Sequence, residues 1–104
     1  MISDIVNALA DVADERNRQD ARWGEQNHPD GTGGAVSEAL ADMAKADYER
    51  AAATGAMTWE LVLWEEVAEA LAETDPARLR EELIQVAAVA VAWAECIDRR
   101  GAAK

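Results

Sequence analysis

Residues 63–85 read LWEEVAEALAETDPARLREELIQ, and this stretch decides the fold. Asp75 followed by Pro76 is a helix start, because the aspartate side chain can accept from free backbone amides and proline has no amide donor to leave unused. Apolar and acidic residues repeat at three- and four-residue spacing on both sides of this dipeptide, as they do in amphipathic helices. The sequence therefore predicts two helices joined by a tight turn, which run antiparallel as neighbours.

The same spacing extends outward from this pair along the whole chain. Four helices are expected, over about residues 4–23, 37–54, 58–73 and 76–100. Ser37 and Thr58 can cap the second and third helices through their hydroxyls, and Gly24, Gly55 and Gly101 are natural helix ends. A loop crowded with glycine, proline and asparagine separates the first two helices, and no alternating strand pattern occurs. The prediction is a single all-α domain over residues 1–104, built as a four-helix fold.

The composition limits the classes of partner. A formal charge of −11 opposes the approach of phosphate backbones and anionic lipid headgroups and favours cations, so we expect neither a nucleic acid polymer nor a membrane as partner. Half of the residues are hydrophobic, but much of that share is alanine, and the aromatic residues are four tryptophans and one tyrosine. Each helix therefore brings little bulk, and we expect a homodimer or homotetramer in which a partner chain completes the burial.

Three further features favour the cytoplasm. Cys96 is the only cysteine, so an intrachain disulfide is excluded and a reducing compartment is favoured. The first residues contain neither a basic start nor a long apolar run, which argues against a secretory signal. The longest apolar stretch, residues 86–94, is far shorter than the roughly 20 residues that a bilayer span requires.

The acidic residues of the central stretch carry the candidate chemistry. Glu65, Glu66 and Glu69 lie three or four residues apart, so their side chains converge on one side of a helix. With about 1.5 Å of rise per residue from the turn at residue 75, Glu69 and Glu82 lie at roughly 9 and 10.5 Å, and Glu66 and Gln85 at roughly 13.5 and 15 Å. If the two helices face each other, the level pairs form a box of oxygen ligands.

Hard divalent cations such as Mg²⁺ or Mn²⁺ prefer oxygen ligands of this kind. Like charges brought so close raise carboxylate pKa values and cost stability until a cation neutralises them. The alternative is a solvated face, because helices rich in alanine and glutamate are common without a ligand. Spacing alone leaves both interpretations open.

These residues carry a resemblance to a known family. EEVAE at 65–69 followed by ELIQ at 82–85 resembles the ExxE and ExxD pair of the MazG-like nucleotide pyrophosphohydrolases, all-α enzymes that bind Mg²⁺ between two helices. LREELIQVAAVA at 79–90 and RWGEQNH at 22–28 are similar to phage and actinobacterial members of that superfamily. Together the matching segments extend over most of the chain.

The resemblance implies a MazG-like fold and hydrolysis of a nucleoside triphosphate between its α and β phosphates, which releases a monophosphate and pyrophosphate. Glu66, Glu69 and Glu82 would be metal ligands, and Glu65 would orient or deprotonate the attacking water. Gln85 stands where the family usually has aspartate; its amide oxygen can still bind a cation but adds no charge, so metal affinity should fall. Two alternatives remain open: a catalytically silent helical module that binds a nucleotide or a protein, and a purely structural helical oligomer.

Four other residues are candidate substrate contacts. Trp23 could stack on a nucleobase while Gln26 or His28 reads its edge, and Arg80 could hold a phosphate. Three of them also have an ordinary structural interpretation: a core residue at a helix end for Trp23, a turn for His28 and a solvated surface for Arg80. A core position or a dimer interface is the expectation for the remaining tryptophans, Trp59, Trp64 and Trp93.

Overall fold

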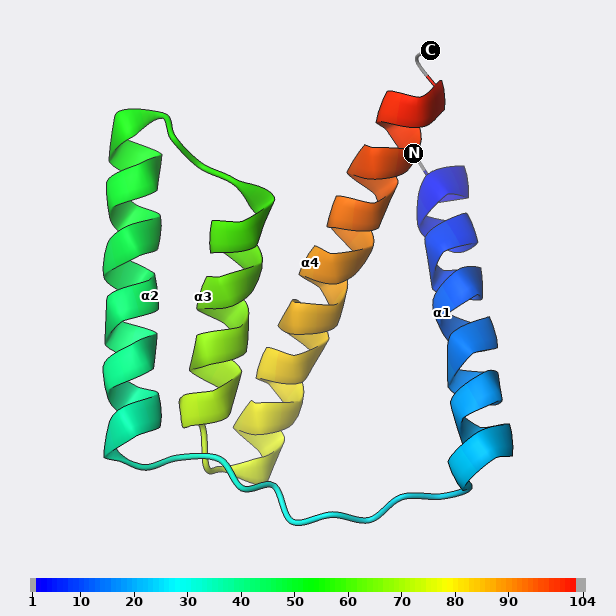
Figure 1. Cartoon of the computed structure of the whole chain (residues 1–104), viewed down its shortest axis with the longest axis horizontal. Coiled ribbons are helices and arrows are strands. Elements are labelled where there is room, and N and C mark those ends of the chain that lie inside the picture. The colour runs from blue at the N-terminus through cyan, green and yellow to red at the C-terminus, as the bar shows by residue number, and fades with distance from the viewer. Residues whose placement is uncertain (1, 103–104) are drawn as a thin grey trace. The chain divides into compact units, whose positions relative to one another are not determined.

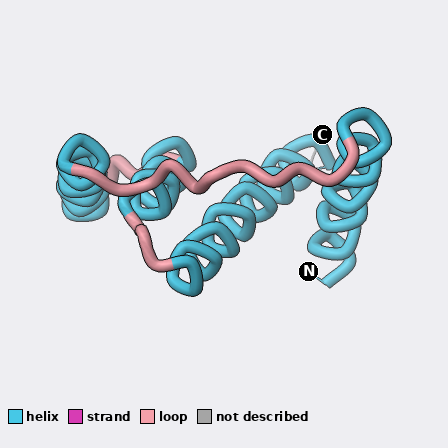
Figure 2. The backbone as a smooth tube through the Cα atoms, turned by 90° about the horizontal axis from the view of Figure 1, so that it is seen from below, coloured by secondary structure: helices cyan, strands magenta, loops and turns pink. Residues whose placement is uncertain are grey.

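The computed structural model describes residues 2–102, with side chains described for residues 4–101. Four α-helices follow one another along the chain: α1 (Ile2–Trp23), α2 (Ala35–Thr54), α3 (Trp59–Ala72) and α4 (Pro76–Ala102) (Figure 1). No strand occurs between residues 2 and 102, which confirms the predicted all-α class (Figure 2). Within the same residues, no helix combines the length and the apolarity needed to cross a bilayer.

The first helix ends where the sequence predicts it. Gly24 has a φ of 68° and donates its backbone N–H to the Asp20 carbonyl over 2.8 Å. A positive φ of this size favours glycine, so the residue ends α1 and turns the chain into the loop that leads to α2.

The start of α2 differs from the prediction. The helix begins at Ala35 with Gly34 as its N-cap, and no side chain caps it, so the expectation that Ser37 is the cap is wrong. Gly34 has a φ of 95°, which a residue with a Cβ adopts at a cost, and this turn places the N-cap of α2 three residues before Ser37. At the other end Gly55 adopts the left-handed conformation and donates to the Ala51 carbonyl, as expected.

Both helices of the central pair start with the predicted caps. Thr58 Oγ1 accepts from the backbone N–H of Leu61 over 3.2 Å, and Asp75 Oδ2 accepts from that of Arg78 over 3.0 Å. Helix α4 continues through Gly101 to Ala102, two residues past its predicted end, because that glycine does not take a positive φ.

The chain divides into two compact units, which we describe separately. One consists of Met1–Asp30 and Val91–Lys104, and the other of Gly31–Ala90. Helix α4 contributes residues to both. The prediction of a single domain remains a prediction.

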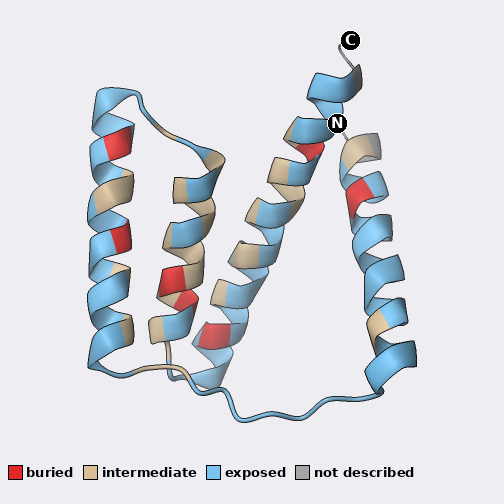
Figure 3. Cartoon of the chain, in the orientation of Figure 1, coloured by how far each residue is buried: buried red, intermediate tan, exposed pale blue. Residues whose placement is uncertain are grey.

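The second unit is built around small side chains. Helices α2 and α3 pack side by side, and the buried residues of both helices are alanines (Figure 3). Small residues let two helix backbones approach closely, but they bury little apolar area. The buried side chains of this unit are Ala44, Ala51, Ala68, Ala70 and Leu79.

A short strap fixes the chain before α2 to the end of α3. Gly33 donates its N–H to the Leu71 carbonyl over 2.8 Å, and Thr32 Oγ1 donates to the Glu73 carbonyl over 2.6 Å. These bonds satisfy carbonyls that the last turn of α3 leaves free. A Cβ at position 33 would collide with the Thr74 side chain, so glycine is required for the close approach.

Candidate acidic metal site

Three carboxylates of α3 converge at one place. Glu65, Glu66 and Glu69 each offer one carboxylate oxygen, and these oxygens lie within 4.8 Å of one another. All three side chains are partly buried. The convergence follows from the helix itself, because residues three and four apart share a side of an α-helix.

A fourth carboxylate reaches this cluster from α4. Glu82 is close enough to Glu69 for the two carboxyls to share a hydrogen bond. The negative charges of Glu66 and Glu73 also raise the pKa of Glu82. The turn capped by Asp75 reverses the chain, so the first turns of α4 run back along α3. The acidic cluster, defined here as Glu65, Glu66, Glu69 and Glu82, therefore joins two helices.

The electrostatics of the cluster favour protonation or a cation. Burial raises the pKa values of Glu65, Glu66 and Glu82 above their ordinary value, and the negative charge of Glu69 raises them further. Helix α3 has no lysine or arginine in its sequence. Among residues 4–101 no salt bridge involves a member of the cluster, so its charge is not offset by a basic side chain.

Glu65 has the most unusual surroundings of the four. Its Oε2 is buried and has no hydrogen-bond partner among the described residues. Its pKa is raised first by burial, then by the charge of Glu69 and by a hydrogen bond shared with that carboxyl. A buried carboxylate oxygen without a donor is costly in the charged state, so this atom is suited to accepting a proton or contacting a cation.

The donor set fits a hard divalent cation. Mg²⁺ binds oxygen at about 2.0–2.1 Å, so two of its ligands stand at most about 4.2 Å apart, and Ca²⁺ allows about 5 Å. The oxygens of Glu65, Glu66 and Glu69 span up to 4.8 Å, so rotamer shifts of less than an ångström would bring them into range. Carboxylate oxygens alone, without histidine or thiolate, match Mg²⁺, Mn²⁺ or Ca²⁺ better than softer metals.

Two other predicted residues lie on α4. Gln85 is exposed and stands one helical turn beyond Glu82. Arg80 is also exposed, and it precedes Glu82 by two residues, which places the two about 200° apart around the helix. Contact of Gln85 with a cation and of Arg80 with a phosphate remain predictions.

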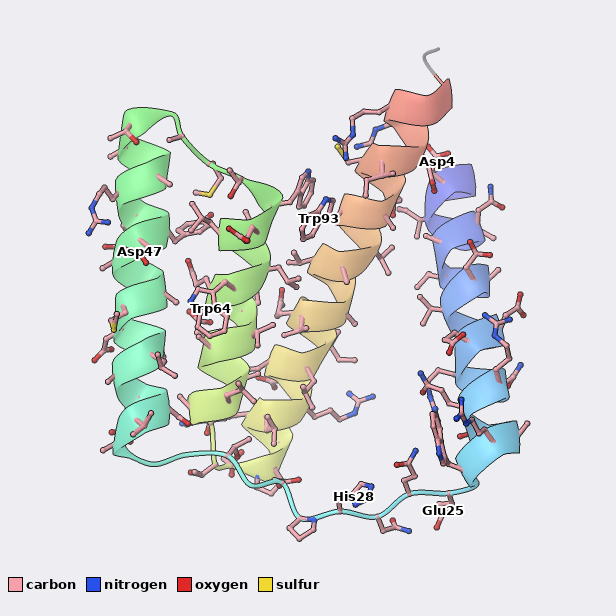
Figure 4. All side chains as sticks on the ribbon, viewed as in Figure 1. Asp4, Glu25, His28, Asp47, Trp64 and Trp93 are labelled. Atoms are coloured by element: carbon pink, nitrogen blue, oxygen red, sulfur yellow. The ribbon has the colours of Figure 1, made fainter. Side chains whose placement is uncertain are left out.

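The predicted base-reading residues lie in the first unit, whereas the acidic cluster lies in the second. Trp23 is the last residue of α1 and is 58% exposed, which does not fit a buried core position, and the Arg22 guanidinium lies 4.7 Å from its ring centroid. His28 Nε2 and Gln26 Oε1 are 3.0 Å apart in the exposed loop that follows (Figure 4). A polar depression adjoins this segment and is lined by Arg16, Asp20, Gly24, Glu25 and Gln26.

Two acidic neighbours were not foreseen from the sequence. The charges of Glu49 on α2 and Glu73 after α3 contribute to the raised pKa values of Glu65 and Glu82, respectively. The spacing of residues within α2 cannot show which side of that helix faces α3. The sequence therefore could not predict that Glu49 lies near Glu65. Glu73 ends the predicted third helix and could have been counted with the cluster.

Comparison with protein families, with curated proteins and with solved structures gives no match for this chain.

Proposed function

We propose that this chain is a metal-dependent nucleoside triphosphate pyrophosphohydrolase of the MazG-like type, which cleaves between the α and β phosphates to give a nucleoside monophosphate and pyrophosphate. One observation carries the proposal: three α3 carboxylates lie within 4.8 Å of one another, Glu82 joins them from α4, and no salt bridge among residues 4–101 neutralises them. The ExxE and ELIQ spacing supports it, because these motif positions supply Glu66, Glu69 and Glu82, and Glu65 directly precedes the first of them.

The residues divide the chemistry between them. Glu66, Glu69 and Glu82 would hold a divalent cation, Mg²⁺ or Mn²⁺. Such a cation, when bound, supplies charge to phosphate oxygens and makes a nearby water more acidic. Glu65 would accept the proton of the attacking water, and its raised pKa makes it a stronger base than an ordinary glutamate. One water is consumed, one P–O bond is broken and pyrophosphate leaves.

The substrate contacts belong to the same proposal. Trp23 offers an exposed aromatic surface on which a base could stack, and Gln26 and His28 present polar groups two residues apart. Arg80 would contact a phosphate. Cys96 is a free thiol, which fits the proposed cytoplasmic location, where thiols stay reduced.

A second candidate function is a catalytically silent module of the same fold that binds a nucleotide or a protein. Gln85 favours it, because the neutral amide stands where the resembling enzymes usually have aspartate. Such a protein keeps the helices and the acidic cluster but does not hold enough charge for catalysis.

One assay separates these functions. The chain is incubated with a panel of canonical and modified nucleoside triphosphates and Mg²⁺ or Mn²⁺, and the pyrophosphate released is measured. We expect metal-dependent turnover that Glu69→Ala abolishes.

Melting measurements complete the assay. Absence of turnover with a nucleotide that still raises the melting temperature would favour the silent module, since a ligand that prefers the native state must stabilise it. If neither metal nor nucleotide shifts melting, the glutamates are a solvated face and both functions are wrong.

A further inference from the structure

The strap formed by Thr32 and Gly33 contacts the short linker between the two helices that carry the acidic cluster. Gly33 bonds to the carbonyl of Leu71 in the last turn of α3, and Thr32 bonds to the carbonyl of Glu73, the residue that follows the helix. Residues 73–75 lead directly into α4. In Figure 1 the chain that precedes α2 passes the end of α3 at which α4 begins. The strap therefore lies where it can influence how α4 leaves α3.

The way in which α3 ends gives the strap its role. The C-cap Glu73 is extended, with a φ of −85° and a ψ of 130°, and its N–H donates to the Ala70 carbonyl over 3.2 Å. An extended C-cap leads the chain away from the helix, so the chain that follows does not supply donors to the remaining carbonyls. Thr32 and Gly33 supply two such donors from a segment about forty residues earlier. The end of α3 is therefore held from outside the helix.

Hydrogen bonds within the linker extend this constraint to α4. Glu73 Oε1 accepts from the backbone N–H of Asp75 over 3.0 Å, and Asp75 Oδ2 accepts from that of Arg78, also over 3.0 Å. The N–H of Leu79, which is buried, donates to the Asp75 carbonyl over 2.8 Å. A continuous series of hydrogen-bonded residues therefore runs from Thr32 through the linker to the first turn of α4.

Glycine at position 33 brings the strap against the linker itself. Gly33 has a φ of 92°, and a Cβ at this position would collide with the Cγ2 methyl of Thr74. A side chain at position 33 would therefore have to displace either the strap or the linker. The close approach of the two segments depends on the missing Cβ.

The geometry of the acidic cluster depends on this linker. Glu69 lies four residues before Glu73, and Glu82 lies seven residues after Asp75, so both are within about two helical turns of the linker. Glu82 is the member of the cluster that comes from α4, so a change in the angle between the helices moves it relative to the three α3 glutamates. Mg²⁺ requires its ligands at about 2.0–2.1 Å in a nearly ideal octahedron, so a displacement of about 1 Å removes an oxygen from the ligand set.

We propose that Thr32 and Gly33 are positioning residues of the cation site, which hold the α3–α4 linker so that Glu82 faces Glu69. The inference rests on the proposed function, because it requires the acidic cluster to bind a divalent cation. The two strap residues act through the end of α3 and its linker and not by contact with a cation. Loosening the strap leaves the three α3 glutamates together, since one helix carries them all, and displaces the ligand from α4.

Calorimetric titration of Mg²⁺ into the full chain, Thr32→Val and Thr32→Ser tests the proposal. Thr32→Val removes the hydroxyl at nearly constant volume and leaves the Glu73 carbonyl without its donor. We expect the Mg²⁺ affinity of this variant to fall by about 5-fold or more, as it does when groups that orient metal ligands are removed. Thr32→Ser keeps the donor and should bind within about two-fold of the unaltered chain. Circular dichroism checks that the variants keep their helices at the titration temperature.

Thr54→Val is the matched control. Thr54 Oγ1 donates to the Arg50 carbonyl over 3.0 Å at the end of α2, so the substitution removes the same kind of bond within the same compact unit. Both valine variants should lose thermal stability, but Thr54→Val should keep the Mg²⁺ affinity of the unaltered chain within about two-fold. A merely structural role for Thr32 would give equal affinities in the two variants.

Gly33→Ala tests the close approach separately. The added methyl has to displace the strap or the linker, so we expect the Mg²⁺ affinity to fall by about 10-fold or more. Adding Thr74→Ser removes the colliding methyl and should recover part of this loss, while the strain of a positive φ remains.

The outcomes separate this inference from the proposed function. If the unaltered chain binds Mg²⁺ and both Thr32→Val and Gly33→Ala bind it equally well, the positioning role is wrong and the proposed function stands. Equal losses of affinity in Thr32→Val and Thr54→Val, or a Thr32→Ser variant as weak as Thr32→Val, also overturn the positioning role. If the unaltered chain binds neither Mg²⁺ nor Mn²⁺, the proposed function is wrong and this inference is wrong with it.

Discussion

Helices α1 and α3 both carry several carboxylates, but their surroundings differ. On α1, Asp20 pairs with Arg16 over 2.9 Å and Glu15 pairs with Arg18 over 2.8 Å, and all four side chains are more than half exposed. On α3 the three glutamates are partly buried, face one another and have no basic partner among the described residues. A count of acidic residues would not distinguish the two helices.

The difference teaches what turns acidic residues into a candidate site. On α1 each of these carboxylates is neutralised by an arginine of the same helix, at the three- and four-residue spacing that lets side chains meet on a helix. The same spacing on α3 brings like charges together, and partial burial denies them full hydration. Only the second arrangement would gain a large stabilisation if a cation bound there.

The largest effect is expected from removing one clustered carboxylate. Glu66→Gln should lower metal-dependent pyrophosphate release by about 100-fold or more, because it removes a charged ligand from the proposed cation site. Glu15→Gln on α1 is the control and should leave the rate within about two-fold, since its partner is an exposed arginine. Equal losses in both variants would show that the two helices do not differ in function.

An intermediate effect is expected from adding charge to the cluster. Gln85→Asp should tighten Mg²⁺ binding by roughly 10-fold, because a carboxylate replaces a neutral amide beside the other ligands. The measurement is a calorimetric titration of the metal into both proteins. Identical titration curves would remove Gln85 from the ligand set.

A smaller effect is expected from pH. The raised pKa values of Glu65, Glu66 and Glu82 mean that the folded chain binds more protons than the unfolded chain above their ordinary value of 4.5. The contribution of these groups to stability therefore falls as pH rises from about 4.5 through the raised values. Urea unfolding in metal-free buffer should show this loss.

Glu65→Gln supplies the check on the pH effect. It removes the carboxyl with the buried, unpartnered oxygen, so the metal-free variant should be more stable than the unaltered chain near pH 7 by a few degrees in Tm. Saturating Mg²⁺ should reduce this difference in Tm between the variant and the unaltered chain. A variant that is less stable at neutral pH would show that Glu65 is satisfied in the native state.

The smallest effect is expected on α1. Arg18→Gln should lower Tm by less than about 2 °C, because exposed pairs contribute little to stability and salt screens them. Thermal unfolding at low and high salt measures it. A loss of many degrees would mean that the α1 pairs are structural, and the contrast with α3 would weaken.

The sequence predicts more of the fold than of the site's surroundings. Gly55, Thr58 and Asp75 mark helix ends through local chemistry, and the structure has helix ends at each. The prediction that Ser37 caps α2 was wrong because Gly34, three residues earlier, already turns the chain into α2. Where two nearby residues can each start a helix, the conformation of the preceding loop determines which of them becomes the N-cap.

The parts that could not be predicted depend on tertiary contacts. Glu49 becomes a neighbour of Glu65 only through the packing of α2 on α3. Thr32 and Gly33 of the strap donate hydrogen bonds to carbonyls about forty residues away, and no periodic pattern in the sequence predicts these bonds. The convergence of Glu65, Glu66 and Glu69 was predictable because one helix contains all three.

The central claim is that the acidic cluster of α3 and α4 binds a divalent cation, and calorimetric titration of Mg²⁺ and Mn²⁺ into the chain tests it most directly. We expect saturable binding that releases protons at slightly acidic pH, is lost in a Glu66→Gln, Glu69→Gln double variant and is kept in a Glu15→Gln, Asp20→Asn double variant. Absence of binding by the unaltered chain, or equal binding by the two double variants, would contradict the claim.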